Sequence, residues 1–334
     1  MSWRRVVQFL VGSMLLGVPL LGQMAKFNFV SIDVGGAVET QVRGVNKYGE
    51  IVGFFRVANS ACPVQGPSLQ VPSCNVRGFK IEKGRLVKLM VPGSVSTAIM
   101  GVNDKGDLVG FYLKPDTKCS PGIYHGFLWL HTNVVKTIDY PGTAFCGNER
   151  SWNVPMGINY AGTVVGTLWN IVDGLPAGGF VWKNGKFSVM DLGEPGYCYA
   201  CSGVYGISNN GIIVGSAWRT MGIPMWAGYL KQGITDDFFV KTQDDTFPTG
   251  INNATDIVGF GVYGTGFIAN RIEPNGGVDK GGVITPEFLW LMHPDGISTF
   301  PFGINDGRVV VGTYMVESGA LHGFVAAPGS VAAG

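Results

Sequence analysis

The stretch Gly44-Val45-Asn46-Lys47-Tyr48-Gly49-Glu50-Ile51-Val52-Gly53 decides the fold, because the chain repeats its pattern five more times. The further copies begin at Gly101, Gly157, Gly206, Gly250 and Gly303, so successive copies start 57, 56, 49, 44 and 53 residues apart. Self-similarity at a spacing of several tens of residues is the signature of a repeat architecture. We therefore interpret the chain as six similar units.

Each copy has the composition of a β-hairpin. A short apolar run ends in Gly-Ile-Asn or Gly-Val-Asn, a turn rich in Asn, Asp and Gly follows, and a β-branched strand such as 51–53 comes next. We expect the Asn side chain to hydrogen-bond the turn backbone, as Asn does in such turns. The alternative is a ligand or ion role, but Ser208 replaces the Asn in the fourth copy, which favours the role in the turn.

A second motif follows each hairpin and indicates a third strand. We place the six third strands at Gly78-Phe79, His125-Gly126-Phe127, Gly179-Phe180, Gly228-Tyr229, Phe288-Leu289-Trp290 and His322-Gly323-Phe324. Short turns then lead into fourth strands such as 85–91. Four antiparallel strands in each unit of about 50 residues are typical of a propeller blade, so the sequence predicts an all-β, six-bladed β-propeller.

The two ends of the chain complement each other. The last copy ends after its third strand at 322–327, while 27–34 precedes the first hairpin and resembles a fourth strand, particularly 137–140. Pairing the N-terminal strand with the last blade would close the ring and remove an exposed sheet edge. We therefore predict a single propeller domain over residues 26–328, closed in this way, with a short tail at 329–334.

These residues resemble the HAF-type extracellular repeat proteins of bacteria, a family named for a His-Ala-Phe element. Its counterpart here is His-Gly-Phe at His125 and His322, beside the Gly-Ile-Asn hairpins and an Ile-Asp-x-Pro-Gly-like turn at 138–142. The likeness covers nearly the whole chain after the N-terminal segment, although four of the six third strands lack the His. The resemblance implies secretion and a propeller-like repeat fold, and it implies no defined reaction or ligand.

The composition agrees with an all-β globular protein and excludes other classes. Gly and Pro supply 52 and 18 of the 334 residues, too many for long uninterrupted helices, so a helix bundle is excluded. Apolar residues make up 46%, which is enough for a core, so the chain is not disordered. Lys and Arg number 24 against 23 Asp and Glu, which leaves no net field to attract a nucleic acid or an anionic membrane.

The N-terminus predicts export. Arg4 and Arg5 precede an apolar run at 6–22, the pattern of a secretory signal peptide. We assign 1–25 as the signal peptide, with cleavage near 22–25, and expect the mature protein to be secreted, periplasmic or extracellular. The alternative is an uncleaved anchor, since 17 residues lie at the short limit of a membrane span.

Strand order predicts two unlike ends of the propeller. Successive strands run up and down, so the first-to-second and third-to-fourth turns share one end, which we call the hairpin face. The other connections share the opposite end, the loop face. We expect all the long insertions at the loop face, namely 56–76, 113–124, 140–155, 193–205 and 261–286. Long loops on a rigid scaffold commonly carry binding sites, which makes the loop face the functional candidate.

All the cysteines of the chain lie in those insertions, and their number is 6. An even number of cysteines in an exported chain predicts disulfides. From their positions we expect Cys62 to pair with Cys74, Cys119 with Cys146, and Cys198 with Cys201. Three alternatives to a disulfide stay open for the last pair: a redox dithiol, half of a zinc site, or free thiols. The sequence lacks the thioredoxin-like context of a redox dithiol and the two further ligands that a zinc site needs.

No catalytic set is recognisable in the sequence. Of the four histidines, His125 and His322 recur at one repeat position, which favours a structural role, while we place His131 and His293 in third-to-fourth turns at the hairpin face. No Gly-x-Ser-x-Gly, His-Glu-x-x-His or Walker-type motif is present. Acidic pairs at 236–237 and 244–245 supply oxygen ligands of the type Ca²⁺ prefers, but their spacing does not match a ligand loop. We therefore expect no cofactor and no metal site.

The strongest candidate for a binding site combines a charged pair with aromatic residues. It comprises Glu149, Arg150, Trp152, Tyr197, Tyr199 and Tyr205, which we place on two neighbouring insertions at the loop face. Aromatic rings can stack on a sugar ring while charged groups hydrogen-bond its hydroxyls. The alternative is that these side chains pack the loops onto the disulfides.

The hypothesis from sequence is a secreted, monomeric, non-catalytic binding or interaction module. Its expected ligand is a carbohydrate or a cell-surface protein, bound at the loop face. Two alternatives stay open, an extracellular carbohydrate hydrolase or lyase and a structural envelope or matrix repeat protein. Paired carboxylates about 5 to 10 Å apart in a central pocket on that face would favour the enzyme.

Overall fold

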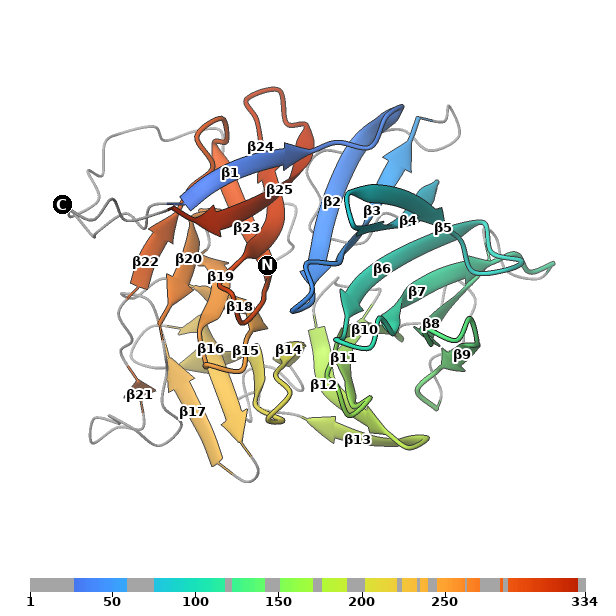
Figure 1. Cartoon of the computed structure of the whole chain (residues 1–334). Helices are drawn as coiled ribbons and strands as arrows, with labels where there is room; N and C mark the ends of the chain where they lie inside the picture. Colours follow the sequence, from blue (N-terminus) through green and yellow to red (C-terminus); the bar gives the residue numbers. More distant parts are fainter. Residues whose placement is uncertain are drawn as a thin grey trace.

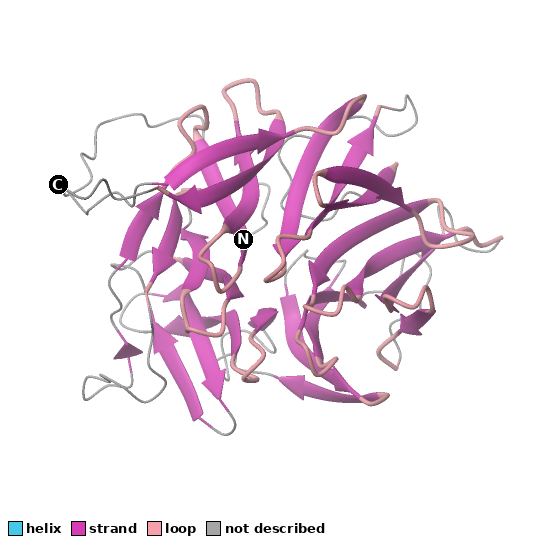
Figure 2. Ribbon diagram, in the orientation of Figure 1, coloured by secondary structure: helices cyan, strands magenta, loops and turns pink. Residues whose placement is uncertain are grey.

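The computed structural model describes residues 27–58, 75–117, 122–141, 151–170, 176–190, 202–220, 224–232, 235–239, 245–261, 263–270, 283–284 and 288–329. These residues form six sheets around a common centre, each built on four antiparallel strands and one of them extended by a short fifth strand, so the six-bladed β-propeller is confirmed (Figure 1). Figure 2 shows strands joined by loops throughout these ranges, and they contain no helix with the length and hydropathy of a membrane span.

The blades follow one another along the chain. Blade one contains β2 (Ala37–Val45), β3 (Ile51–Val57), β4 (Val76–Glu82) and β5 (Arg85–Leu89). Blade two contains β6 (Ser96–Val102), β7 (Leu108–Lys114), β8 (Ile123–Trp129) and β9 (Val135–Ile138). Blade three contains β10 (Ser151–Ile158), β11 (Val164–Asn170), β12 (Pro176–Lys183) and β13 (Lys186–Met190).

The remaining blades keep the same order of strands. Blade four contains β14 (Ser202–Ile207), β15 (Ile213–Thr220), β16 (Pro224–Gln232) and β17 (Thr235–Phe239). Blade five contains β18 (Thr246–Ile251), β19 (Ile257–Gly261), β20 (Gly266–Ala269) and β22 (Phe288–Leu291). Blade six contains β23 (Ser298–Ile304), β24 (Val310–Met315), β25 (Leu321–Pro328) and β1 (Phe27–Ile32).

The N-terminal strand closes the ring, as the sequence predicted. β1 pairs antiparallel with β25, with Val30 opposite Val325 and Ser31 opposite Phe324. Figure 1 shows the blue β1 lying along the red β25. The fourth strand of blade six is therefore supplied by the start of the domain, and the first and last strands hold each other by a full ladder of backbone hydrogen bonds.

The closure repeats a contact made inside an ordinary blade. In blade two, His125 Nδ1 lies 2.8 Å from a carboxylate oxygen of Asp139. In blade six, His322 Nδ1 lies 2.8 Å from Asp33, on the other side of the closure. In both blades a tyrosine ring stacks on the histidine. The structural role expected for the two recurring histidines is therefore confirmed.

The Gly-Phe pattern of the third strands reflects close packing within each blade. The aromatic residue at this position is fully buried in every blade: Phe79, Phe127, Phe180, Tyr229, Phe267 and Phe324. The Phe79 ring lies over Gly53 of the second strand, where an added Cβ would come 3.0 Å from the ring, and the Phe324 ring lies over Gly312 at 2.7 Å. In every blade but the second, the final Gly of the hairpin motif therefore makes room for the ring of the next strand.

A different set of glycines brings the blades together at the centre. The first residue of each hairpin motif is Gly44, Gly101, Gly157, Gly206, Gly250 or Gly303. A Cβ added at any of them would lie only 3.1 to 3.4 Å from the Cα of the corresponding glycine in the next blade. The six innermost strands therefore approach backbone to backbone in a closed ring of glycines, which we call the Gly ring.

Blade five differs from the expectation. Phe288-Leu289-Trp290 belongs to the fourth strand β22, and the third strand is β20, which carries its own Gly266-Phe267 pair. The long insertion of this blade therefore joins the third strand to the fourth and starts from the hairpin face, so placing it at the loop face was wrong. Within this insertion, β21 (Val283–Ile284) pairs in parallel with β17 of blade four.

His293 also lies elsewhere than expected, between β22 and β23 at the loop face rather than in a third-to-fourth turn. Its ring stacks on Tyr314 with 3.6 Å between centroids and meets the edge of Phe29 of β1 at 5.1 Å. Burial lowers the pKa of His293, while the nearby Asp295 acts in the opposite direction and His322 in the same one. The neutral imidazole therefore packs against the strand that closes the ring.

We predict that the buried ring of Phe324 is essential for closure. Phe324→Ala should lower the free energy of unfolding by about 3 to 5 kcal/mol, because it removes a fully buried aromatic ring and leaves a cavity. Urea unfolding followed by tryptophan fluorescence measures this change. The control is Val30→Ala in the same strand pair, which should cost about 0.5 kcal/mol or less because Val30 is 63% exposed. Equal effects of the two changes would contradict the pairing.

We also predict that acid weakens the closure. A histidine with a lowered pKa in the folded state stabilises the protein fully above its unfolded pKa of 6.5, and this contribution is lost as the pH falls below that value. Between about pH 7.5 and about pH 5, the free energy of unfolding should decrease more steeply for the natural chain than for His293→Phe. Urea titrations at several pH values test this, and parallel curves for the two proteins would disprove it.

Candidate ligand-binding pocket

A β-bulge occurs at one position in the first strand of every blade. The strand register shifts between Val42 and Gly44 in blade one, and the other five blades shift at the residue before their Gly-ring glycine. A bulge leaves one residue unpaired and redirects its side chain. The six bulged residues are Arg43, Met100, Met156, Tyr205, Thr249 and Phe302, and all of them line one pocket on the axis of the propeller.

The pocket occupies the end of the central channel next to the hairpin face. Its lining runs from the bulged residues past the Gly ring to residues of the hairpin turns, so its mouth lies among those turns. Its volume is about 110 Å³. The pocket is therefore large enough for one end of a ligand rather than for a whole drug-sized molecule.

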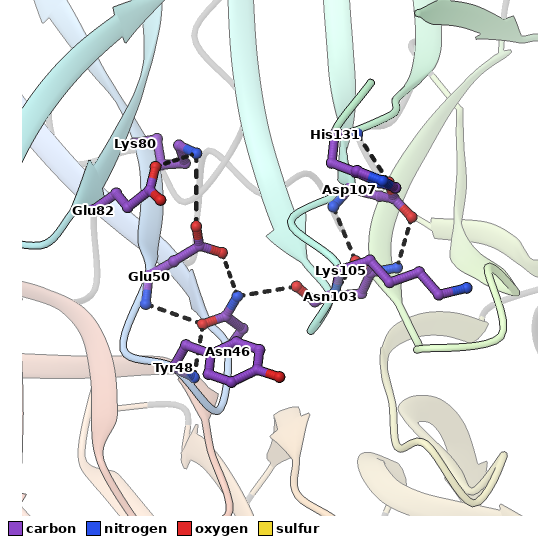
Figure 3. A network of polar contacts seen from close by, with 9 residues as sticks. All are labelled: Asn46, Tyr48, Glu50, Lys80, Glu82, Asn103, Lys105, Asp107 and His131. Carbon is purple, nitrogen blue, oxygen red and sulfur yellow. Dashed lines mark hydrogen bonds and ion pairs between the residues drawn. The ribbon is translucent and has the colours of Figure 1, made fainter. Parts of the chain in front are cut away.

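The walls of the pocket are held by the side chain at one turn position that recurs in every blade. We call the six residues at this position the Asn belt: Asn46, Asn103, Asn159, Ser208, Asn252 and Asn305. Asn103 shows the arrangement (Figure 3): its Oδ1 accepts the backbone N–H groups of Lys105 and Asp107 at 3.0 and 2.9 Å. Its Nδ2 donates to the backbone carbonyl of Asn159 in the next blade at 3.1 Å. The predicted role in the turn is confirmed, and the same side chain also joins neighbouring blades.

The Asn belt is continuous except at blade four. Five of the six possible amide-to-carbonyl bonds between blades are made. Ser208 holds its own turn by accepting the Ile212 N–H at 3.1 Å, but it has no amide to reach blade five. There, the next residue makes the link, since the backbone N–H of Asn209 donates to Asn253 Oδ1 at 2.8 Å. All six blades are therefore joined around the pocket.

Charged residues support the belt from outside. Asp107 accepts hydrogen bonds from Asn103 Nδ2 at 3.1 Å and from the His131 backbone at 2.9 Å, and its Oδ1 lies 2.8 Å from His131 Nδ1 (Figure 3). Burial alone would raise the pKa of Asp107, but the hydrogen bonds from His131 and Asn103 outweigh it and lower the pKa. Asp107 is therefore ionised at neutral pH and fixes the turn on which His131 lies.

The rim of the pocket is formed by the residues that follow the Asn belt. Asp104 accepts the Lys47 N–H at 3.0 Å with one carboxylate oxygen and Asn209 Nδ2 at 2.9 Å with the other. On the opposite side, Asp306 accepts both the backbone N–H and Nδ2 of Asn253, at 2.9 and 2.8 Å. The rim is thus a ring of oriented amide and carboxylate groups.

Two exposed tyrosines stand next to this rim. Tyr48 is 70% exposed and Tyr160 is 51% exposed. Lysine ammonium groups lie over their faces, with Lys47 Nζ 4.9 Å from the Tyr48 centroid and Lys105 Nζ 4.5 Å from the Tyr160 centroid. Such cation–π contacts hold the rings in place while leaving apolar surface open to solvent.

Arg43 is the charged member of the bulged residues. Its side chain is only 5% exposed, and its guanidinium lies 3.9 Å from the centroid of Phe302 and 5.2 Å from that of Phe54. Its Nη2 donates to Gln41 Oε1. Burial lowers the pKa of Arg43 to about 9, although the charge of Glu39 acts against this shift. The arginine remains a cation at neutral pH in a largely desolvated position.

Of the residues expected to form a site, one reaches this pocket. Tyr205 lies in β14 rather than in a loop, and it lines the pocket, with Ser216 Oγ donating to its hydroxyl at 3.3 Å. Burial raises the pKa of Tyr205, so the phenol stays neutral. For Trp152 the structure describes the strand position in β10, and Glu149, Arg150, Tyr197 and Tyr199 lie outside the described residues.

The six cysteines and the N-terminal segment also lie outside the described residues, so the disulfides and the signal peptide stay predictions. Within the described part of the chain, no three His, Cys, Asp or Glu side chains gather as they would around a metal ion. The pocket itself was missed from the sequence. The available signal was the residue before each hairpin motif, which changes from blade to blade while its neighbours repeat.

Comparisons with known proteins find solved structures that align with most of the chain at low identity and low TM-score. No family model matches the sequence, and no curated protein matches it. A protein assigned provisionally as a gluconolactonase shares 11% identity at a TM-score of 0.44, covering 91% of this chain and 92% of its own. A provisionally assigned oxidoreductase (glucose dehydrogenase) of Thermus thermophilus shares 10% identity at a TM-score of 0.45, and the alignment covers 90% of this chain and 100% of that protein. The SapL1 lectin in complex with alpha methyl fucoside shares 11% identity at a TM-score of 0.37, and the alignment covers 86% of this chain and 93% of the lectin.

We predict that the Asn belt stabilises the whole propeller. Asn103→Ala removes the bonds to two turn N–H groups and to the next blade, and should lower the free energy of unfolding by about 2 to 3 kcal/mol. Asn103→Ser, which imitates blade four, keeps an acceptor for the turn and should cost about half as much. The measurement is urea unfolding. Asn210→Ala, at an exposed position of the same face, is the control, and an Asn103→Ala effect no larger than this control would contradict the prediction.

Proposed function

We propose that this protein is a non-catalytic binding module whose ligand enters the central pocket at the hairpin face. The observation that carries this proposal is the contrast between the pocket and its walls. The Gly ring is the same in all six blades and the Asn belt nearly so, because every blade has the same packing and turn to satisfy. The bulged residues, in contrast, include a cation, a phenol, a hydroxyl, a phenyl ring and two thioethers. A lining that changes around the ring, with only Met100 and Met156 alike, suits recognition of an asymmetric ligand.

The chemistry of the described pocket supports binding over turnover. No histidine lines it, and its two carboxylates, Asp104 and Asp306, each accept hydrogen bonds from neighbouring turns. Each of these oxygens keeps a further lone pair, so carboxylates held in this way can accept hydrogen bonds from a ligand at fixed positions.

The loop face is proposed as a second contact surface. Glu149, Arg150, Tyr197 and Tyr199 belong to insertions assigned to that end of the propeller, and Trp152 lies near the start of β10, next to one of them. Aromatic and charged side chains there suit a glycan or a protein surface. Export through residues 1–25, the three disulfides, the monomeric state and membership of the HAF-type repeat family are part of the same proposal, supported by the sequence patterns alone.

A glycan array and a pull-down with the mature protein test the proposed function. We expect to find a ligand whose affinity falls at least about tenfold in Met156→Trp, because the indole fills the pocket and occupies the space of the ligand. The matched control is Val134→Trp at an exposed turn, which should bind as the natural chain does. The proposal fails if a ligand binds equally to all three proteins, or if no ligand binds and the protein turns over a substrate.

A further inference from the structure

The polar cluster behind the pocket contains more positive than negative charge. Arg56 donates two hydrogen bonds to Glu39 Oε2, at 2.9 and 2.7 Å, and Gln41 donates to the other carboxylate oxygen. All three side chains are buried, as is Arg43. Two guanidinium groups thus share one carboxylate, and that carboxylate is fully engaged by Arg56 and Gln41. Among the described residues Arg43 therefore has no ion pair of its own, and only the nearby charge of Glu39 acts on it.

Arg43 also has unused hydrogen-bonding capacity. Among the described residues its Nε has no partner, although the atom is buried. A buried donor without an acceptor is unfavourable, and more so when it belongs to a charged group. The guanidinium lies over the Phe302 ring, and its Nε has almost no solvent-accessible surface, so a ligand in the pocket meets the outer edge formed by Nη1 and Nη2. Carboxylate oxygens fit that edge with two parallel bonds.

The size of the pocket limits what can reach Arg43. A pocket of about 110 Å³ lies well below the roughly 300 Å³ at which sites begin to enclose a whole ligand, so it admits a carboxylate and the few atoms next to it, while the rest of a larger ligand lies outside the mouth. Outside the mouth are the exposed faces of Tyr48 and Tyr160 and the oriented amide and carboxylate groups of Asn253 and Asp306. Aromatic faces with planar hydrogen-bonding groups beside them suit a ring that carries several hydroxyls.

We infer that the pocket binds the carboxylate of a terminal uronate residue of an acidic glycan, with Arg43 as the residue that contacts the carboxylate. This inference rests on the proposed function and names its ligand class. The sugar ring then lies at the rim, where Asp306 and Asn253 hydrogen-bond its hydroxyls, and the following sugar lies against Tyr160. An acidic peptide offers a carboxylate but no ring to match this rim, so the glycan is the better fit.

The experiment is isothermal titration calorimetry of the mature protein with a trisaccharide that ends in glucuronate. Its methyl ester, the trisaccharide ending in glucose, the corresponding 6-sulfated glycan and a tripeptide ending in glutamate are the comparison probes. We expect the glucuronate probe to bind at least tenfold more tightly than each of the others. Because the ester changes the ligand and leaves the protein as it is, this comparison does not depend on the folding of a variant.

Variants of the protein locate the contact. Arg43→Met should reduce affinity for the glucuronate probe at least tenfold and leave the weak binding of the ester unchanged, while Arg85→Met, at an exposed position of the outer strand β5, should match the natural chain. If Arg43→Met does not fold, Arg43→Lys keeps the charge and should still lose affinity, because the ammonium lacks the planar pair of donors. Tyr160→Ala should weaken both the glucuronate probe and the ester.

The outcomes separate this inference from the function on which it rests. Equal binding of the glucuronate and glucose probes, both abolished by Met156→Trp, would overturn the uronate inference and leave the pocket as a binding site. Tighter binding of the sulfated glycan or the peptide would overturn it in the same way. Loss of all binding with measurable turnover would overturn both.

Discussion

The constraint on which the structure depends is the close approach of six strands around one axis. At the Gly ring, the Cα of one blade lies where the Cβ of its neighbour would come within 3.1 to 3.4 Å, so a side chain at this level would push the blades apart. Backbone groups packed so closely between blades must also be hydrogen-bonded, because a buried polar group without a partner is unfavourable. The Asn belt meets this need by joining each turn to itself and to the next blade.

Closure of the ring follows from the same constraint. Six blades meet around the axis only if the last blade is complete, and β1 completes it from the other end of the domain. The contact is equivalent to an internal one, since Asp33 meets His322 as Asp139 meets His125. The buried stack of His293 on Tyr314 reinforces this junction from the loop face. The closing strand therefore packs on the core of the last blades through Phe27 and Phe29, which are partly buried against it.

The bulges explain how a repeated scaffold acquires a distinct site. Just before the Gly ring, each first strand carries one residue that the sheet does not pair, and its side chain turns toward the axis. This position is released from the demands that keep its neighbours constant, so Arg43, Tyr205 and Phe302 can differ without cost to the blades. The rigid belt then holds these unlike groups at fixed positions, which is what selective binding requires.

The sequence by itself determined the number of blades, the order of strands and the closure, because these follow from a local pattern repeated six times. It also indicated the turn role of Asn46 and its equivalents, since Asn bonds its own turn over a few residues. It misplaced the third strand of blade five, where the Gly266-Phe267 pair was overlooked beside a long insertion. Only the tertiary structure decided that the Asn amides link blades, and that Arg43 and Tyr205, far apart in the chain, line one pocket. These contacts join different blades, and no pattern within a single repeat encodes which side chains meet on the shared axis.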